Sequence, residues 1–401
     1  MTSVMEDVVG RETRHVVQTY RRQPITLVRG QGVRLWDSEG REYLDLLSGI
    51  GVAALGHAHP GLARAISEQA TTLIHTSNLF YHPLQGQLAE QLAALSGLPR
   101  AFFCNSGAEA VEACLKFARR YWYTKKEPRA EFIALDESFH GRTFGALSVT
   151  SDEHYRAPFE PLLPTVTFVP VNDPAALAAA VSTRTAAIIA EPLLGEGGIR
   201  PLTPAFAAAI REACAKTGAL FIADEVQCGL GRTGHPFYFQ ALGLTPHLVS
   251  VGKALGGGVP VGAALVGQEV ADTLSFGDHG STYGGNLLAC RAALCVLHEL
   301  VDGGLMMQIN RVGRHFEKTL RAVAARHSFV KDVRGAGLMW GVELDRDAGP
   351  IVPAGLAHGV IVNRTADTVI RLLPPLVITE AEADEALGRL DAALGAMGGT
   401  A

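Results

Sequence analysis

Two residues in the middle of the chain, Lys253 and Asp224, have the types and the surroundings that covalent chemistry needs. Asp224 follows the apolar run 220–223 (LFIA), and Lys253 follows the run 247–251 (HLVSV). Such runs predict buried parallel strands, which hold ligands at their carboxyl ends. The neighbours of Lys253 are glycine, alanine and leucine, so an apolar pocket is expected to favour its neutral amine. A neutral lysine amine is a nucleophile toward aldehydes.

A nucleophilic lysine beside a buried carboxylate matches what pyridoxal phosphate requires. This cofactor forms a Schiff base with a lysine, and it accepts electrons only while a carboxylate keeps its pyridine nitrogen protonated. Lys253 is the candidate for the attachment point and Asp224 for the carboxylate. Each residue alone has a simpler interpretation, because an aspartate at a strand end is often a cap and a lysine is usually solvated.

The elements that position these residues follow from the apolar pattern. From about residue 84 helices and strands alternate, with a helix to Ser96, a helix from Glu109, and strands at 101–104 and near 131, 165, 186, 219 and 248. This alternation predicts an α/β fold with a mostly parallel sheet flanked by helices. A hairpin is expected within 33–47, and a helix within 286–301.

After residue 301 the pattern changes to a smaller α+β unit. Amphipathic helices are expected at 305–327 and 380–396, and short strands at 337–344, 360–362 and 369–372. The sequence therefore predicts three parts: an N-terminal segment 1–50 that joins the small domain, a large cofactor-binding domain 51–301, and a C-terminal small domain 302–401.

Composition narrows the classes of function. The 401 residues are 48% hydrophobic, which allows a large core, and the net charge of -5 without basic runs argues against nucleic acid as a partner. The apolar segments are too short to cross a membrane, and the N-terminal residues lack a signal-peptide pattern, so a cytoplasmic protein is expected. The six cysteines lack metal-ligand spacing, and structural roles are expected for them. His57 and His59 could bind a metal, but no acidic or cysteine ligand is near them in the sequence, so structural roles are favoured for them too.

Residues 105–109 (NSGAE) are expected to lead from a strand into a helix. The N–H groups at such a helix start, with Ser106 as cap and Gly107 giving space, can bind a phosphate group. A capping box without any ligand is the alternative interpretation.

Three other motifs carry groups suited to a flat ring and to carboxylates. In ESFHGRT, Phe139 can cover a ring and Arg142 can bind a carboxylate through two hydrogen bonds. EPLLGEGG carries Glu196, and VIRLLPP carries Arg371 in an otherwise apolar run. A charged residue there needs a partner, and Glu196 is the predicted one.

Taken together, these motifs resemble the class III, fold type I pyridoxal-phosphate aminotransferases. FFCNSGAEA, ESFHGRT, EPLLGEGG, ADEVQCGLGRTG, VGKALGGGVPVG, GSTYGGN and VIRLLPP occur in the order and spacing of that class, over roughly residues 30–380. Within the class they are most similar to the acetylornithine aminotransferases. The resemblance implies transfer of the δ-amino group of N2-acetyl-L-ornithine to 2-oxoglutarate, a step of arginine biosynthesis.

The resemblance also assigns residues. It implies catalysis by Lys253 and Asp224, and an obligate homodimer with shared active sites. The implied cofactor-binding residues are Ser106, Gly107, Ala108, Phe139, Asp224, Glu225, Val226, Gln227, Lys253 and Thr282, with Gln227 near the phenolic oxygen and Thr282 reaching the neighbouring subunit's phosphate. The implied substrate-binding residues are Arg142, Ser281, Glu196 and Arg371, with Ser281 acting across the interface. Ala108 and Leu194 depart from the family's usual Thr and Gln.

Other functions remain open at this point. Within the class, the donor could instead be ornithine, succinylornithine, 4-aminobutyrate or a carrier-linked semialdehyde of lysine biosynthesis, and a semialdehyde aminomutase would need no external acceptor. A nicotinamide dehydrogenase would need GxGxxG directly after the first strand, which is lacking. A cofactor-free binding protein would be expected to lack Lys253 or Asp224, and both are present.

Overall fold

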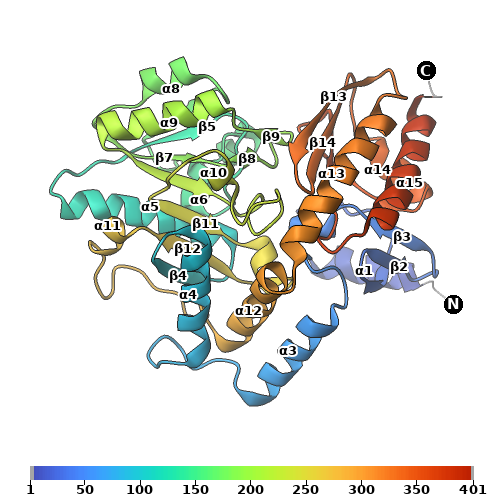
Figure 1. Cartoon of the computed structure of the whole chain (residues 1–401), viewed down its shortest axis with the longest axis horizontal. Coiled ribbons are helices and arrows are strands. Elements are labelled where there is room, and N and C mark those ends of the chain that lie inside the picture. Colours follow the sequence, from blue (N-terminus) through green and yellow to red (C-terminus); the bar gives the residue numbers. More distant parts are fainter. Residues whose placement is uncertain (1–3, 399–401) are drawn as a thin grey trace.

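The computed structural model describes residues 4–398, so residues 1–3 and 399–401, which the predicted outer segments include, lie outside the described residues. Its largest sheet has seven strands. This sheet and the helices around it together form one side of the molecule (Figure 1). In their order across the sheet, the strands are β4 (Arg100–Cys104), β12 (Gly262–Val266), β11 (Leu248–Val251), β10 (Leu220–Asp224), β7 (Thr185–Ala190), β5 (Glu131–Leu135) and β6 (Val166–Val169).

This sheet is mostly parallel, as the sequence predicted. Parallel pairs join β6, β5, β7, β10 and β11, whereas β12 pairs antiparallel with both β11 and β4. The sequence pattern did not predict β12. Residues 252–261 connect β11 to β12, and this connection is too short for a crossover helix, so the chain returns in the opposite direction.

Both faces of the sheet are buried. Along β5, Phe132 and Ala134 belong to one hydrophobic cluster, and Ile133 and Leu135 belong to the other. Alternate side chains of a strand point to opposite faces, so the continuous apolar runs of the sequence reflect helices on both sides.

The helices of this part begin and end at residues that suit helix termini. In α9 (Pro204–Thr217), proline occupies the first turn, the Thr203 hydroxyl accepts a hydrogen bond from Phe206 N at 3.2 Å, and Gly218 follows with φ 74°. The other helices here are α3 (Pro60–Thr72), α4 (Pro83–Ser96), α5 (Gly107–Thr124), α6 (Phe144–Ser148), α7 (Glu153–Arg156), α8 (Pro174–Ala180), α10 (Tyr238–Ala241), α11 (Gln268–Ala271), α12 (Leu287–Val301) and the 3₁₀ turns η1 (Ala157–Phe159) and η2 (Lys253–Gly256).

A second part of the molecule contains the two chain ends (Figure 1). One antiparallel sheet has the order β13 (Val330–Ala336), β14 (Met339–Leu344), β17 (Val369–Leu372) and β16 (Asn363–Thr365). Another has the order β1 (Leu27–Gln31), β2 (Arg34–Asp37), β3 (Glu42–Asp45) and β15 (Val360–Ile361). The helices are α1 (Val4–His15), α2 (Ser48–Gly51), α13 (Leu305–Ala324), α14 (Ile351–Ala357) and α15 (Glu380–Gly398). Strands from both chain ends therefore share one sheet, in which β15 pairs parallel with β3.

Most predicted elements of this part are present, including the hairpin of β2 and β3. The elements α1, β1, β13 and β16 were not predicted from the sequence. A short hairpin of β8 (Leu193–Leu194) and β9 (Arg200–Pro201), also not predicted, surrounds residues 195–199.

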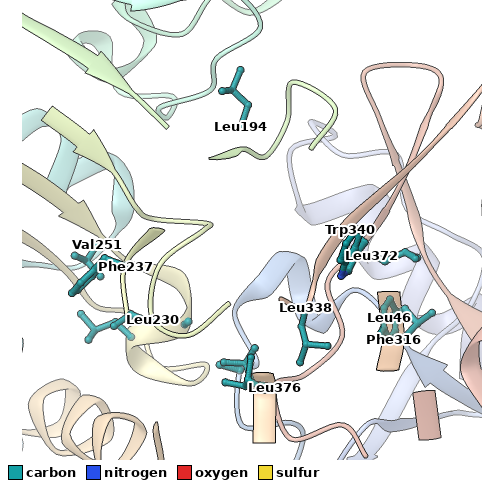
Figure 2. Packing of buried hydrophobic residues seen from close by; sticks show 14 of the residues in the cluster. Leu46, Leu194, Leu230, Phe237, Val251, Phe316, Leu338, Trp340, Leu372 and Leu376 are labelled. Carbon is teal, nitrogen blue, oxygen red and sulfur yellow. The ribbon is translucent and has the colours of Figure 1, made fainter. Parts of the chain in front are cut away.

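Buried hydrophobic residues join the two parts. Val251 and Phe237 from the large sheet region lie in the same cluster as Leu338, Trp340 and Leu372 from the C-terminal sheet (Figure 2). Among residues 4–398, no single helix is long and apolar enough to span a membrane, although the bent pair of α12 and α13 passes that test together.

The residues that the sequence assigned to structural roles have local partners. His59 Nδ1 accepts a hydrogen bond from Leu62 N at 3.2 Å and caps α3, and His57 Nε2 lies 2.8 Å from Asp45 Oδ2. All six cysteines are free thiols; Cys214 and Cys295 are partly exposed, and the others are buried.

Candidate active site

Lys253 begins η2, directly after β11, at the carboxyl edge of the large sheet. Its φ of 42° lies in the left-handed region, which a lysine adopts only when the surrounding structure imposes it. The preceding Gly252 packs against the start of α5, since a Cβ there would lie 3.1 Å from the backbone nitrogen of Gly107. Burial lowers the pKa of Lys253 below its ordinary value, although the nearby Glu196 carboxylate opposes this. The direction of this shift makes the neutral amine more accessible than in a solvated lysine.

The Asp224 carboxylate has a partner on each oxygen. His140 Nδ1 lies 2.6 Å from Oδ2, while Oδ1 accepts hydrogen bonds from the Ser250 hydroxyl at 2.9 Å and from Val226 N at 3.1 Å. We call Asp224, His140, Ser250 and Val226 the Asp224 cluster. Asp224 and Ser250 are register partners on β10 and β11, so the sheet itself sets their separation.

His140 was not among the residues predicted from the sequence. It belongs to the ESFHGRT motif and is buried, and its Nε2 has no hydrogen-bond partner among residues 4–398. An unpaired buried polar atom beside a carboxylate is typical of functional sites. The signal in the sequence was a histidine next to Phe139, shortly after a predicted strand.

A second group of charged and polar residues surrounds Arg371. Arg371 Nη1 forms a short ion pair with Glu196 Oε1, as predicted, and donates to Gln227 Oε1 at 3.2 Å. Its Nε donates to Asn363 Oδ1 at 3.2 Å, and the Thr365 hydroxyl donates to the backbone oxygen of Glu196 at 2.5 Å. We call these five residues the Arg371 cluster.

The two charges of the Arg371 cluster differ in burial. The side chain of Arg371 is 1% exposed and that of Glu196 is 34% exposed. Burial would raise the pKa of Glu196, but the charge of Arg371 lowers it below the ordinary value. Gln227, which was predicted to lie near a phenolic oxygen, has its amide between these two charges, with Nε2 3.4 Å from Glu196 Oε1.

The start of α5 combines a cap with free donors. Ser106 Oγ accepts a hydrogen bond from Glu109 N at 3.2 Å and caps the helix, whereas the Glu109 carboxylate accepts from Asn105 N instead of completing a capping box. The N–H groups of Gly107 and Ala108 nevertheless have no acceptor among the described residues. A Cβ on Gly107 would lie 2.6 Å from Val226, so only glycine allows α5 to start this close to β10. Capping and phosphate binding are thus compatible here.

Glu191 holds two loops of the site together. Its carboxylate accepts hydrogen bonds from Phe139 N at 3.0 Å and from Gly195 N at 2.8 Å. Burial raises the pKa of Glu191 to about 7 despite these bonds. No role was predicted for Glu191 from the sequence, although Glu191 lies in the same motif as Glu196.

A cleft of 430 Å³ opens beside these loops, with Phe139, Tyr155, Glu196 and Thr365 among its lining residues. The guanidinium of Arg142 lies over the ring of Tyr155, 3.6 Å from the ring centre. Arg142 is exposed, and a carboxylate could reach it.

Two predicted residues have partners of their own, and a third is exposed. The Glu225 carboxylate accepts a hydrogen bond from Phe239 N at 2.7 Å, and burial raises its pKa to about 7, so this side chain serves the start of α10. Ser281 Oγ accepts from Asn105 Nδ2 at 3.2 Å, next to the capping residue of α5. Thr282 is exposed.

Comparison with known proteins identifies the family. Residues 16–394 match the family described as aminotransferase class-III. The chain belongs to this family. It is 45% identical to an acetylornithine aminotransferase from Methanocaldococcus jannaschii over 96% of this chain and 97% of that protein. It is 46% identical to one from Archaeoglobus fulgidus over 95% of this chain and 98% of that protein.

Solved structures agree with this class-III fold. The ornithine aminotransferase of Toxoplasma gondii has a TM-score of 0.94 at 33% identity, covering 99% of this chain and 96% of that one. The acetylornithine aminotransferase of Elizabethkingia anophelis has a TM-score of 0.88 at 34% identity, covering 98% of this chain and all of the other. The predicted fold type I architecture is thus confirmed, and the chain is a pyridoxal-phosphate-dependent aminotransferase.

The residues present fit this cofactor. The partly buried amine of Lys253, the carboxylate of Asp224 and the free N–H groups of Gly107 and Ala108 meet at one edge of the sheet. They supply a nucleophile, an anion for a protonated ring nitrogen, and donors for a phosphate.

Proposed function

We propose that this class-III aminotransferase transfers the δ-amino group of N2-acetyl-L-ornithine to 2-oxoglutarate, giving N-acetylglutamate 5-semialdehyde and glutamate in arginine biosynthesis. The observation that carries the proposal is that Glu196 neutralises Arg371 while Arg142 has no ion pair among the described residues. The unpaired guanidinium of Arg142 can bind one carboxylate, and N-acetylornithine carries one. The 45–46% identity to proteins named acetylornithine aminotransferase supports this donor.

The cofactor would be held by residues at the carboxyl ends of β10 and β11 and at the start of α5. When bound, pyridoxal phosphate supplies an aldehyde carbon and an electron sink. Lys253 would hold it through Nζ, Asp224 would keep its ring nitrogen protonated, and Phe139 would cover its ring. The residues proposed for its phosphate and its edges are Ser106, Gly107, Ala108, Glu225, Val226 and Gln227.

The chain's own groups then bind the donor and move protons. Arg142 binds the α-carboxylate of the donor, whose acetylated α-nitrogen is unreactive, and this leaves the δ-amine to point toward Lys253. Lys253 Nζ would take the proton from the donor carbon and would later return one. Burial lowers the pKa of Lys253, and this direction supports a role as the base.

Glu196 allows one pocket to accept both substrates. While the donor binds, the Glu196 carboxylate covers the charge of Arg371. When 2-oxoglutarate or glutamate binds, its second carboxylate replaces Glu196 on Arg371, since one Arg–carboxylate pair exchanges for another of similar strength. The 34% exposure of Glu196 supports such a movement. A static ion pair is the alternative.

We also propose a cytoplasmic homodimer in which Ser281 and Thr282 reach the neighbouring subunit's site, without nucleic acid or membrane as partners. Side chains near this loop support it: Asn78 donates to Ser281 O at 3.2 Å, and the adjoining Leu79 and Phe80 are 85% and 68% exposed. Exposed apolar side chains of this size favour a protein interface. We keep the division into 1–50, 51–301 and 302–401 as the proposed domain organisation.

The test compares initial rates with 2-oxoglutarate as acceptor and four donors: N-acetylornithine, ornithine, N-succinylornithine and 4-aminobutyrate. The proposal predicts the highest kcat/KM for N-acetylornithine. The alternative is another class-III ω-aminotransferase, and ornithine is its first candidate because solved ornithine aminotransferases share the fold at 33–34% identity. A higher kcat/KM for ornithine than for its acetylated form would reject the proposed donor.

A further inference from the structure

The guanidinium of Arg142 is held by an aromatic ring. It lies 3.6 Å from the ring centre of Tyr155 and 5.5 Å from that of Phe139, and among residues 4–398 it forms no hydrogen bond or ion pair. The rings of Tyr155 and Phe139 meet edge to face, with their centres 6.3 Å apart. A cation over a ring face is attracted by the ring's quadrupole, and this contact leaves its N–H groups free.

The carboxylates around the cleft are already engaged, which explains why none of them pairs with Arg142. In the described part of the chain, each acidic residue lining the cleft has its own partner: Glu137 with Arg200, Asp152 with the N–H of His154, Glu196 with Arg371, and Asp367 with Arg364. Arg142 is therefore a cation without a carboxylate partner, and it packs against Tyr155 and Phe139, which both line the cleft.

We propose that Tyr155 is a positioning residue, whose ring holds the Arg142 guanidinium at the cleft in the orientation that receives the substrate carboxylate. This inference rests on the proposed role of Arg142 in substrate binding. Tyr155 suits the task because it lies on α7, a turn capped by Asp152, and is itself partly buried. Its hydroxyl makes no hydrogen bond with the described residues, so the ring alone carries the effect.

The expected consequence is a change in binding rather than in chemistry. The contact between Arg142 and a substrate carboxylate exists both before and during the reaction, so weakening it raises KM and leaves kcat unchanged. Without the ring, the long Arg142 side chain samples other rotamers or turns toward nearby carboxylates, and it must be ordered again when substrate binds.

The experiment compares Tyr155→Leu with Tyr155→Phe in the cofactor-loaded enzyme. For Tyr155→Leu we expect KM for N-acetylornithine and for glutamate to rise about 3- to 30-fold, with kcat within about twofold. The dissociation constant of glutarate, an unreactive dicarboxylate, should rise by a similar factor in calorimetry. Tyr155→Phe keeps the ring and should match the wild type in all three measurements.

A donor without a carboxylate separates positioning from general damage. Single-turnover rates with n-butylamine should be the same in Tyr155→Leu and the wild type, and the melting temperatures should agree. In an Arg142→Met background, Tyr155→Leu should have no further effect on KM. Equal losses for n-butylamine and N-acetylornithine, an unchanged KM in Tyr155→Leu, or a Tyr155→Phe variant as weak as Tyr155→Leu would each overturn the inference.

Failure of the proposed donor would not resemble failure of this inference. If the wild type prefers another ω-amine, the glutamate and glutarate measurements still report on Arg142, because both ligands carry the carboxylates that the cleft would bind. Conversely, a preference for N-acetylornithine with no effect of Tyr155→Leu would leave the proposed function intact and reject the positioning role.

Discussion

The Asp224 cluster and the Arg371 cluster are two buried groups of charges at one site, and they are built differently. The Asp224 cluster lies within the large sheet region, where the register of β10 and β11 sets the distance between Asp224 and Ser250. The Arg371 cluster joins two sheets, because Arg371, Asn363 and Thr365 come from the C-terminal sheet whereas Glu196 and Gln227 come from loops of the large sheet region.

The clusters also differ in how freely their carboxylates can move. Asp224 is 3% exposed, and both of its oxygens are bonded within the site. The Glu196 side chain is 34% exposed and faces the cleft. The comparison teaches that the carboxylate proposed for the ring nitrogen is fixed by hydrogen bonds on both oxygens, whereas the one proposed to give way to a substrate is partly exposed at the cleft. The following predictions test that difference.

Charges of both clusters act on the amine of Lys253, and loss of this residue should have the largest effect. The charges of Glu196, Arg371 and Asp224 all act on its amine, so both clusters serve this residue. Lys253→Ala removes the attachment point and the base, and turnover should fall by more than about 10⁴-fold. Steady-state rates and the visible absorbance of the bound cofactor check this. Lys216→Ala, at an exposed lysine on α9, is the control and should behave as the wild type.

Asp224→Asn should have the next largest effect, because the rigid cluster cannot replace the lost charge. The amide keeps the shape but no longer stabilises a protonated ring nitrogen, so kcat should fall about 10³-fold for every donor and acceptor. Stopped-flow measurement of both half-reactions checks this. A rate within a few-fold of the wild type would mean that another acid is the partner of the ring nitrogen.

Glu196→Ala should have a smaller effect that differs between the two half-reactions. The reason is that the Glu196 carboxylate is proposed to cover the charge of Arg371 only while the donor is bound. With Arg371 uncovered, the half-reaction with glutamate should become faster relative to that with N-acetylornithine. The ratio of the two rates should shift about 10- to 100-fold, as expected for a charge-assisted hydrogen bond. Stopped-flow absorbance of the cofactor measures both rates. Equal losses in both half-reactions would show that the pair is static and would remove the contrast between the clusters.

Glu191 holds together two loops that adjoin the clusters. Its carboxylate should affect how the free energy of unfolding depends on pH. Its pKa is raised from 4.5 to about 7 by burial, so the folded state binds its proton more tightly than the unfolded state. The stabilisation is present below pH 4.5 and is lost as pH rises to about 7. Glu191→Gln should therefore reduce the fall in unfolding free energy between pH 4.5 and pH 8 by about 3 kcal/mol. Denaturant unfolding at several pH values checks this.

The control for that measurement is Glu212→Gln, which alters an exposed carboxylate on α9. It should leave the pH dependence over this range as in the wild type. If Glu191→Gln and Glu212→Gln gave the same pH profile as the wild type, the Glu191 carboxylate would titrate normally and would not be the buried link between the loops.

The sequence by itself determined most strands of the large sheet, the longer helices and the chemical groups at strand ends. Apolar runs before Asp224 and Lys253 reflect burial of both sheet faces, and this is a local property that composition along the chain records. The motif around Ser106 and Gly107 likewise showed where α5 begins. The Glu196–Arg371 pair was predictable because a buried arginine requires an anion, and the motifs offered one.

Tertiary structure alone decided which side chains face each other across the site. His140 meets Asp224, Gln227 joins Arg371, and Tyr155 supports Arg142 through the paths of loops that no periodic pattern describes. Local sequence patterns also did not predict that β12 runs antiparallel to β11, or that β3 and β15 pair in one sheet. The physical reason is that hydrophobic periodicity reports only which face of an element is buried. The partners of a polar side chain depend on strand register, sheet twist and loop conformation, and packing of the whole chain sets these together.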